Sequence, residues 1–194
     1  MTSEATRRSP AATRPATRAT PGSATATRRT SLISEPDRDQ FDFRPHNCFA
    51  CGTLNANGLQ MDIHVEPGRS WSELEIDRRF EGWESIVHGG IVCTILDEVM
   101  AWALVAEDNW GLTARLSVEF KKPVTLGMPV RGEGWIVRSR RRLVETEAHL
   151  VDIARDVVVA TATGLYVAAD DERKRELQAR YGFRRLPASA AVDR

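Results

Sequence analysis

The segment His88-Gly89-Gly90-Ile91-Val92-Cys93-Thr94-Ile95-Leu96-Asp97-Glu98 decides the fold, because it opens the longest apolar stretch of this 194-residue chain. Residues 88–106 show no strand-like alternation and are apolar nearly all round, which predicts a buried helix. Glycines at its start leave backbone N–H groups open to a ligand, and the helix dipole favours negative charge there. An ionised carboxylate among hydrocarbon is expensive to bury, so we expect Asp97 to serve chemistry.

Short segments with a strand pattern surround this helix. Residues 59–65 and 71–77 alternate apolar and polar side chains, and the turn residues between them predict a hairpin. Four more strands are predicted after the helix, at 112–121, 129–138, 142–152 and 157–167. About six antiparallel strands and one long apolar helix predict an α+β fold in which the sheet wraps around a central helix.

The composition divides the chain into three parts. Residues 1–40 are rich in Arg, Thr, Ala and Pro and lack the large apolar side chains of a core, so we expect a disordered tail. Residues 41–169 hold all the predicted strands and the apolar helix, and form the expected globular domain. Residues 170–194 are expected to form a charged, solvated C-terminal helix and a tail.

The charge distribution and the cysteine count exclude some classes of protein. The 27 basic and 27 acidic side chains balance, but residues 1–34 hold six arginines and a single acid, so the remainder is acidic and unsuited to nucleic acid. An odd cysteine count fits a reducing compartment. We see no secretory signal and no apolar run that reaches a membrane span of roughly 18 residues, so we expect a cytoplasmic protein without a membrane partner.

Two cysteines, Cys48 and Cys51, have the CxxC spacing of half a zinc site. Tetrahedral zinc needs four ligands, no second CxxC exists, and His46 and His64 have no common finger spacing. The segment is therefore interpreted as a tight turn before the first strand, and no metal or other cofactor is expected. Cys93 is interpreted as a small core residue.

Several short motifs lie before, within and after the predicted helix. They are Phe80-Glu81-Gly82-Trp83, Val87-His88-Gly89-Gly90, Leu96-Asp97-Glu98, Leu112-Thr113-Ala114-Arg115-Leu116 and Phe120-Lys121-Lys122-Pro123-Val124. Because these motifs occur together, at these spacings and on this order of helix and strands, the stretch from Cys48 to Val167 resembles the hot-dog fold acyl-CoA thioesterases of the PaaI type. One departure is Gly82, which stands where a subgroup of that family carries asparagine.

The resemblance implies hydrolysis of an acyl-CoA thioester. It makes Asp97 the general base or nucleophile and the Gly89 amide the group that holds the carbonyl oxygen. It also implies that His88 orients the thioester and that the Thr113 hydroxyl aligns the attacking water.

Further residues are candidates for substrate binding because of their positions in the sequence. Gly90 and Glu98 are candidate substrate-binding residues. Because Glu98 lies about 100° round the helix from Asp97, it could instead face a dimer interface. Arg140 and Arg142, at a predicted hairpin tip, are candidate ligands for the phosphates of coenzyme A.

Structural roles are open alternatives for several of these residues. The role of His88 could be limited to capping the helix, and that of Asp97 to an ion pair with Arg115. Thr113 could be an ordinary strand residue. The arginine-rich hairpin tip could be a solvated surface. A non-catalytic acyl-CoA-binding protein and an enoyl-thioester hydratase are the alternative functions, the latter weakened by the absence of its usual Asp-to-His spacing.

The spacing of Gly89 and Asp97 predicts a homodimer. Eight residues at about 1.5 Å per residue separate their backbones by roughly 12 Å along one helix. This distance is too large for both groups to contact the same thioester carbonyl. A two-fold dimer that sets the helix start of one subunit near the middle of its partner's helix would unite them. The resemblance likewise implies dimers, with a dimer of dimers as a further assembly.

Overall fold

The computed structural model describes residues 40–186, so the N-terminal tail expected at 1–40 and the last residues of the expected C-terminal tail lie outside the described residues, apart from Gln40. Six strands form one antiparallel sheet. In their order across the sheet they are β2 (His64–Glu66), β3 (Arg69–Glu75), β7 (Pro129–Arg140), β8 (Leu143–Asp152), β9 (Val157–Ala168) and β6 (Gly111–Phe120).

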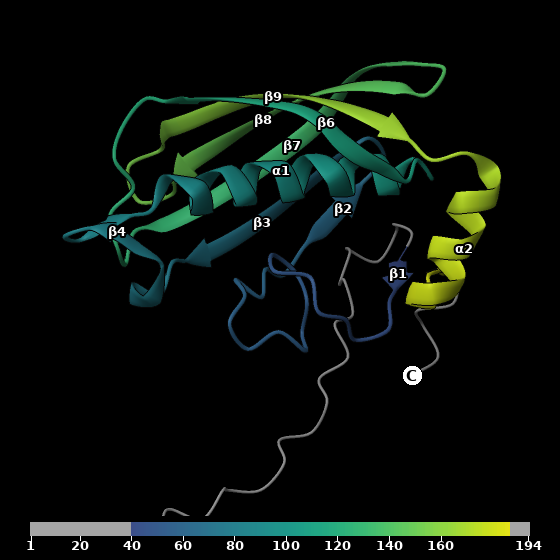
Figure 1. Cartoon of the computed structure of the whole chain (residues 1–194). Coiled ribbons are helices and arrows are strands. Elements are labelled where there is room, and N and C mark those ends of the chain that lie inside the picture. The colour runs from purple at the N-terminus through teal and green to yellow at the C-terminus, as the bar shows by residue number, and fades with distance from the viewer. Residues whose placement is uncertain (1–39, 187–194) are drawn as a thin grey trace, which may run out of the picture.

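Helix α1 (Gly89–Ala106) lies across one face of this sheet (Figure 1). The helix buries its apolar side chains against the strands, and the closest approach is to β7. A Cβ atom added at Gly134 would lie 2.7 Å from the backbone nitrogen of Met100, so only glycine allows the helix to pack this closely. The α+β arrangement expected from the sequence, a sheet around a central helix, is confirmed.

The sequence expectation that no apolar run could span a membrane is wrong for α1 on length and composition alone. The helix has 18 residues and a mean hydropathy of 1.6, and half of it is buried inside the structure. Buried core helices of globular domains have the same properties. In this fold the helix covers the sheet.

The first predicted hairpin is present but shorter than expected. Strand β2 begins only at His64, so the expected strand 59–65 is mostly irregular, while β3 starts two residues before the predicted 71–77. The turn after Glu66 contains Gly68 at φ +65°, a conformation that favours glycine. The four later strands fall within two residues of their predicted starts and ends.

A small hairpin before α1 was not expected from the sequence. It consists of a 3₁₀ turn (Arg78–Phe80), β4 (Glu81–Trp83) and β5 (Ile86–Val87). The backbone N–H of His88 donates to the carbonyl of Phe80 at 2.9 Å, which fixes the start of the helix. A Cβ atom on Gly82 would lie 2.8 Å from the His88 Cα, so the backbone contact itself excludes a side chain at this position.

The two ends of the described chain pair with each other. Strand β1 (Gln40–Asp42) is antiparallel to β10 (Arg184–Leu186), and helix α2 (Asp171–Tyr181) precedes β10 (Figure 1). Lys174 and Gln178 on α2 bond to Asp108 at 2.9 and 3.0 Å. The helix expected in this region is present, but it is tied to the domain instead of standing free in solvent.

Candidate active site

The N-terminus of α1 presents one unpaired backbone donor. His88 is the N-cap, and its Nδ1 accepts the Gly90 N–H at 3.0 Å, while the Ile91 N–H donates to the His88 carbonyl at 2.9 Å. The Gly89 N–H finds no acceptor within residues 40–186, as is typical of the first turn of a helix. A neutral imidazole that accepts at Nδ1 carries its proton on Nε2, so His88 can donate a second hydrogen bond.

A groove of about 570 Å³ opens at this helix start. Its walls combine apolar side chains with two lysines. Its lining residues are Gly82, Trp83, Ile86, Val87, His88, Gly89, Val92, Phe120, Lys121, Lys122, Pro123 and Val124. The groove can therefore take a ligand that is partly apolar and partly anionic.

Asp97 lies half-buried in the middle of α1 and receives two hydroxyl donors on one oxygen. Thr113 Oγ1 on β6 donates to Asp97 Oδ1 at 2.8 Å, and the Tyr166 hydroxyl on β9 donates to the same atom at 2.7 Å. Burial, together with the nearby carboxylate, raises the pKa of Tyr166, so its hydroxyl stays protonated. Oδ2 has no partner among the described residues and is free to act on a substrate.

Two of the structural alternatives can be compared with these contacts. No ion pair joins Asp97 to Arg115 in the part of the chain that the structure describes, so a purely structural pair does not account for the carboxylate. The Thr113 hydroxyl does contact Asp97, and its role in a reaction stays a prediction. His88 does cap the helix, and its exposed ring also lines the groove.

The structure keeps Gly89 and Asp97 apart within one chain. Asp97 is not among the residues that line the groove at the helix start. Thr113, which holds Asp97, and Phe120, which lines the groove, are seven residues apart on β6, a separation of roughly 23 Å along a strand. A single chain therefore offers two incomplete sets of polar groups.

Glu98 points away from Asp97 and joins a different group of residues. Trp102 Nε1 donates to Glu98 Oε1 at 2.9 Å, and the Cys48 Sγ lies 3.9 Å from both carboxylate oxygens. Burial, followed by the adjacent Cys48, raises the pKa of Glu98 to about 7. These contacts give no support to the expected substrate-binding role of Glu98.

The two candidate phosphate-binding arginines lie at the β7–β8 turn and do not line the groove. Arg142 Nε donates to the carbonyl of Ala168 at 2.8 Å, so part of this guanidinium is already engaged, while Arg140 is exposed. Lys121 and Lys122 are the basic side chains at the groove itself. A phosphate role for the arginines stays a prediction.

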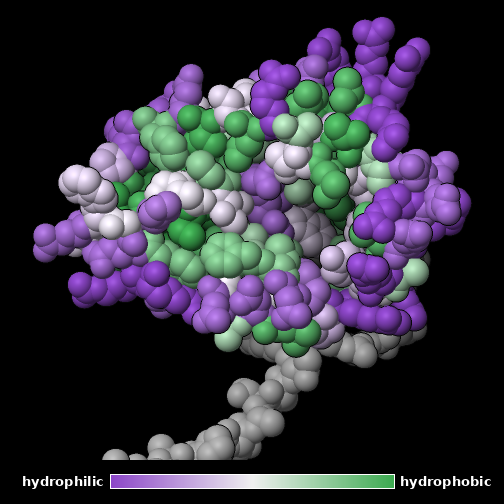
Figure 2. Space-filling model, in the orientation of Figure 1, coloured by the Kyte–Doolittle hydropathy of each residue, from purple (hydrophilic) through white to green (hydrophobic). Residues whose placement is uncertain are grey.

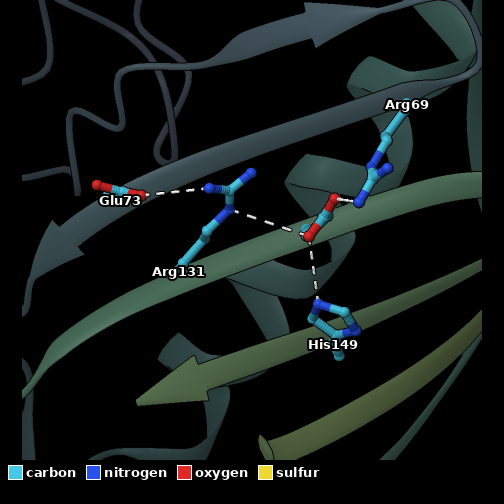
Figure 3. Close-up of polar contacts among 5 residues, drawn as sticks. Arg69, Glu73, Arg131 and His149 are labelled. Carbon is cyan, nitrogen blue, oxygen red and sulfur yellow. Dashed lines mark hydrogen bonds and ion pairs between the residues drawn. The ribbon is translucent and has the colours of Figure 1, made fainter. Parts of the chain in front are cut away.

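A third acidic residue, Glu133 on β7, is 6% exposed and has a structural environment. Gly132 and Gly134 face α1, so alternation along the strand places Glu133 on the opposite face of the sheet. It pairs with Arg69, with Arg131 at 3.9 Å and with His149 at 3.3 Å (Figure 3). Because Arg69 and Arg131 flank it, this buried charge is compensated without a ligand.

Sequence reasoning missed Tyr166. A tyrosine within a strand pattern is usually a packing residue, and no local signal indicates that β9 places it beside Thr113 on β6. Only the register between these two strands brings both hydroxyls to one carboxylate.

Comparisons with known proteins agree with this architecture. Residues 84–159 match the family described as the Thioesterase superfamily. A solved structure described as a thioesterase superfamily protein is 25% identical, with a TM-score of 0.56 over 60% of this chain and 60% of its own length. The chain thus spans less than two thirds of that relative. No curated protein sequence matches.

Two further structures share the fold at lower identity. The PaaI protein from the phenylacetic acid degradation operon of E. coli is 15% identical, with a TM-score of 0.55 over 58% of this chain and 81% of its own. A Streptococcus mutans UA159 protein bound to acetyl CoA is 19% identical, with a TM-score of 0.54 over 56% and 88%. Residues 84–159 thus match the model of the Thioesterase superfamily, and the six-stranded sheet with α1 has the hot-dog fold of these neighbours.

Proposed function

We propose that this chain is an acyl-CoA thioesterase that converts an acyl-CoA thioester and water into a free acid and coenzyme A. The observation that carries the proposal is the Asp97 carboxylate, whose Oδ1 is held by two hydroxyls while Oδ2 has no partner among the described residues. Support also comes from the family match and from a structural neighbour bound to acetyl CoA.

The residues at the start of α1 and the Asp97 carboxylate have different roles in the proposed reaction. The Gly89 N–H and the His88 Nε2–H donate to the thioester carbonyl oxygen and stabilise the negative charge that develops there. Asp97 Oδ2 either removes a proton from the attacking water or attacks the acyl carbon itself, forming an anhydride that water then cleaves. In both routes the C–S bond breaks, and the thiolate leaves and takes up a proton.

A homodimer completes the site in this proposal. Strand β6 is an edge of the sheet, and its side chains Leu112 and Phe120 are 80% and 57% exposed. Apolar side chains gather on the face where α1 and β6 lie (Figure 2). An unpaired, apolar edge strand is a ready pairing surface for a second chain.

The pairing geometry follows from β6. If two copies of β6 pair antiparallel about the point between Leu116 and Ser117, Thr113 of one copy lies opposite Phe120 of the other. Asp97 of one subunit then faces the groove that contains Gly89 of its partner. A further pairing of dimers and a cytoplasmic location stay expectations from the sequence.

Release of free thiol from a panel of acyl-CoA esters tests the activity. The wild-type protein should hydrolyse at least one ester, and Asp97→Asn should lower kcat by about a thousandfold or more, because no carboxylate remains to activate water. Asp171→Asn, at an exposed acid on α2, is the matched control and should keep full activity. Wild-type turnover in Asp97→Asn would overturn the mechanism, and retained ligand binding without any turnover in the wild type would indicate a non-catalytic binding protein.

A mixing experiment tests the shared site. Gly89 occupies the first helical position, where proline is tolerated, so Gly89→Pro removes the N–H with little damage to the helix. Heterodimers of inactive Asp97→Asn and inactive Gly89→Pro chains hold one intact site and should recover part of the activity. Well-folded heterodimers without activity would contradict the shared site.

Isotope labelling distinguishes the two routes. In a single turnover in ¹⁸O-water, a nucleophilic Asp97 acquires the label in its carboxylate, whereas a general base does not. Mass spectrometry of the peptide that contains Asp97 reads the outcome.

A further inference from the structure

The segment before the first strand of the sheet folds against α1 and brings two thiols to a carboxylate. A tight turn closes around Cys48 and Cys51, in which the Gly52 N–H donates to the Cys48 carbonyl at 3.0 Å. The two Sγ atoms and a carboxylate oxygen of Glu98 all lie within 4.8 Å of one another. Residues about 50 positions apart in the sequence thus meet at one point.

His46 adds a fourth donor atom to this group. Its Nε2 lies 3.4 Å from the Cys51 Sγ, and its Nδ1 lies 3.2 Å from the carbonyl of Arg44. A carbonyl can only accept, so Nδ1 carries the proton and the lone pair of Nε2 points at the cluster. Metal-binding histidines are commonly oriented by such a backbone contact.

Glu98 is held in place on the helix side. The Trp102 Nε1–H donates to Glu98 Oε1 at 2.9 Å, and Trp102 itself is buried. Neither lysine nor arginine forms an ion pair with Glu98 among residues 40–186. A half-buried carboxylate beside two thiols, without a cationic partner among the described residues, has little compensation for its charge.

We propose that His46, Cys48, Cys51 and Glu98 bind a zinc ion. Zn–S bonds of about 2.3 Å and Zn–N bonds of about 2.0 Å, at tetrahedral angles, place neighbouring ligand atoms about 3.5 Å apart. The 3.4 Å from His46 to Cys51 and the 3.9 Å from Cys48 to Glu98 lie close to this separation. His46 lies near Cys51 but not within 4.8 Å of all three other ligands, so its ring would have to move toward Cys48 and Glu98 to complete the tetrahedron.

The sequence excluded this site because it lacked a fourth ligand of ordinary spacing. The structure supplies that ligand from α1, as Glu98, in place of His64 on β2. Four protein ligands leave zinc no open position, which is typical of a structural site. Its effect is to fasten the segment around Cys48 to the helix, one residue beyond Asp97.

Metal analysis of reduced, tag-free protein tests the proposal. After incubation with Zn²⁺ and removal of unbound metal, elemental mass spectrometry should find about one zinc per chain in the wild type and in Cys93→Ser. Cys93 lies on the same helix outside the cluster and is the matched control. The variant Cys48→Ser/Cys51→Ser should retain less than a tenth of that zinc.

Cobalt provides a second readout that does not depend on activity. Co²⁺ added to the reduced protein should give a thiolate-to-metal charge-transfer band in the wild type and in Cys93→Ser. Should the double cysteine variant fail to fold, His46→Gln and Glu98→Gln keep both thiols and should each weaken Zn²⁺ binding about tenfold or more. Zinc should also raise the Tm of the wild type, because a ligand that binds only the folded state stabilises it.

Three results would overturn the proposal. They are a reduced wild type that takes up no zinc, equal zinc in the wild type and the double cysteine variant, and a Cys48–Cys51 disulfide that is reduced without any gain of metal binding. None of these outcomes depends on thioester hydrolysis, so the zinc site and the proposed enzyme activity stand or fall separately.

Discussion

The hydroxyl of Tyr166 lies 2.7 Å from Asp97 Oδ1, the oxygen that Thr113 also contacts. Two donors on one carboxylate oxygen fix the rotation of the side chain and direct Oδ2 outward. Tyr166 is almost completely buried, so its ring is held by the core. The position of the reactive oxygen is thus set by residues from two neighbouring strands.

Replacing Tyr166 by phenylalanine should lower kcat about tenfold and change KM little, because one charge-assisted hydrogen bond that orients Asp97 is lost while the groove is intact. Thr113→Val should have a similar effect, and Thr113→Ser, which keeps the hydroxyl, should restore most of the rate. Steady-state kinetics on one acyl-CoA ester measure all three. Wild-type kcat in Tyr166→Phe would show that this hydroxyl does not position the carboxylate.

A charge on the β6 edge should separate the dimer. Leu112→Glu is expected to weaken the proposed dimer at least tenfold and to lower activity in parallel, because each proposed site takes groups from two chains. The control is Val137→Glu, at a side chain on β7 that is 52% exposed. Sedimentation velocity gives the oligomeric state, and a fully active monomer of Leu112→Glu would refute the shared site.

The two glycines of β7 under α1 should differ in their tolerance of alanine. At Gly134 the added methyl group meets helix backbone, with the Met100 nitrogen 2.7 Å away, whereas at Gly132 it meets a side-chain methyl group, the Ile95 Cγ2, at 2.8 Å. We expect Gly134→Ala to lower the free energy of unfolding by about 1–3 kcal/mol and Gly132→Ala by less. Urea unfolding measures both values, and equal losses would contradict this packing argument.

His149 should make stability depend on pH. Burial, then Arg69 and Arg131, lower the pKa of His149 below its ordinary value of 6.5. Just below pH 6.5 the unfolded chain therefore binds this proton more readily than the fold does, and the free energy of unfolding falls as the pH falls. His149→Gln should reduce that slope in urea titrations between about pH 7 and pH 5. An unchanged slope would mean that other titratable groups cause the pH dependence of the free energy of unfolding.

The central helix and the main strands along the chain could be predicted because their signals are local, whereas the order of the strands across the sheet could not. Alternation over a few residues marks β8 and β9, and the unbroken apolar stretch after His88 marks α1. Strands β1 and β10 have three residues each and no such period, so their pairing could not be read from the chain.

Candidate site residues on α1 and β6 could be identified from the sequence because they lie in short motifs. His88, Gly89 and Asp97 occupy one helix, and Thr113 follows on the next element. Contacts that depend on register or on distant segments could not be predicted. Tyr166 reaches Asp97 from 69 residues away, and Cys48 reaches Glu98 from 50.

The pairing of β1 with β10 brings the first and last described strands side by side. A short linker between residues 40 and 186 would therefore close the backbone into a ring, and the exposed β7–β8 turn at Arg141 could supply new termini. A circularly permuted chain of this kind would leave α1 and β6 uncut. Fusion partners could then be attached at the β7–β8 turn, which lies at the end of the sheet where β9 leads into α2.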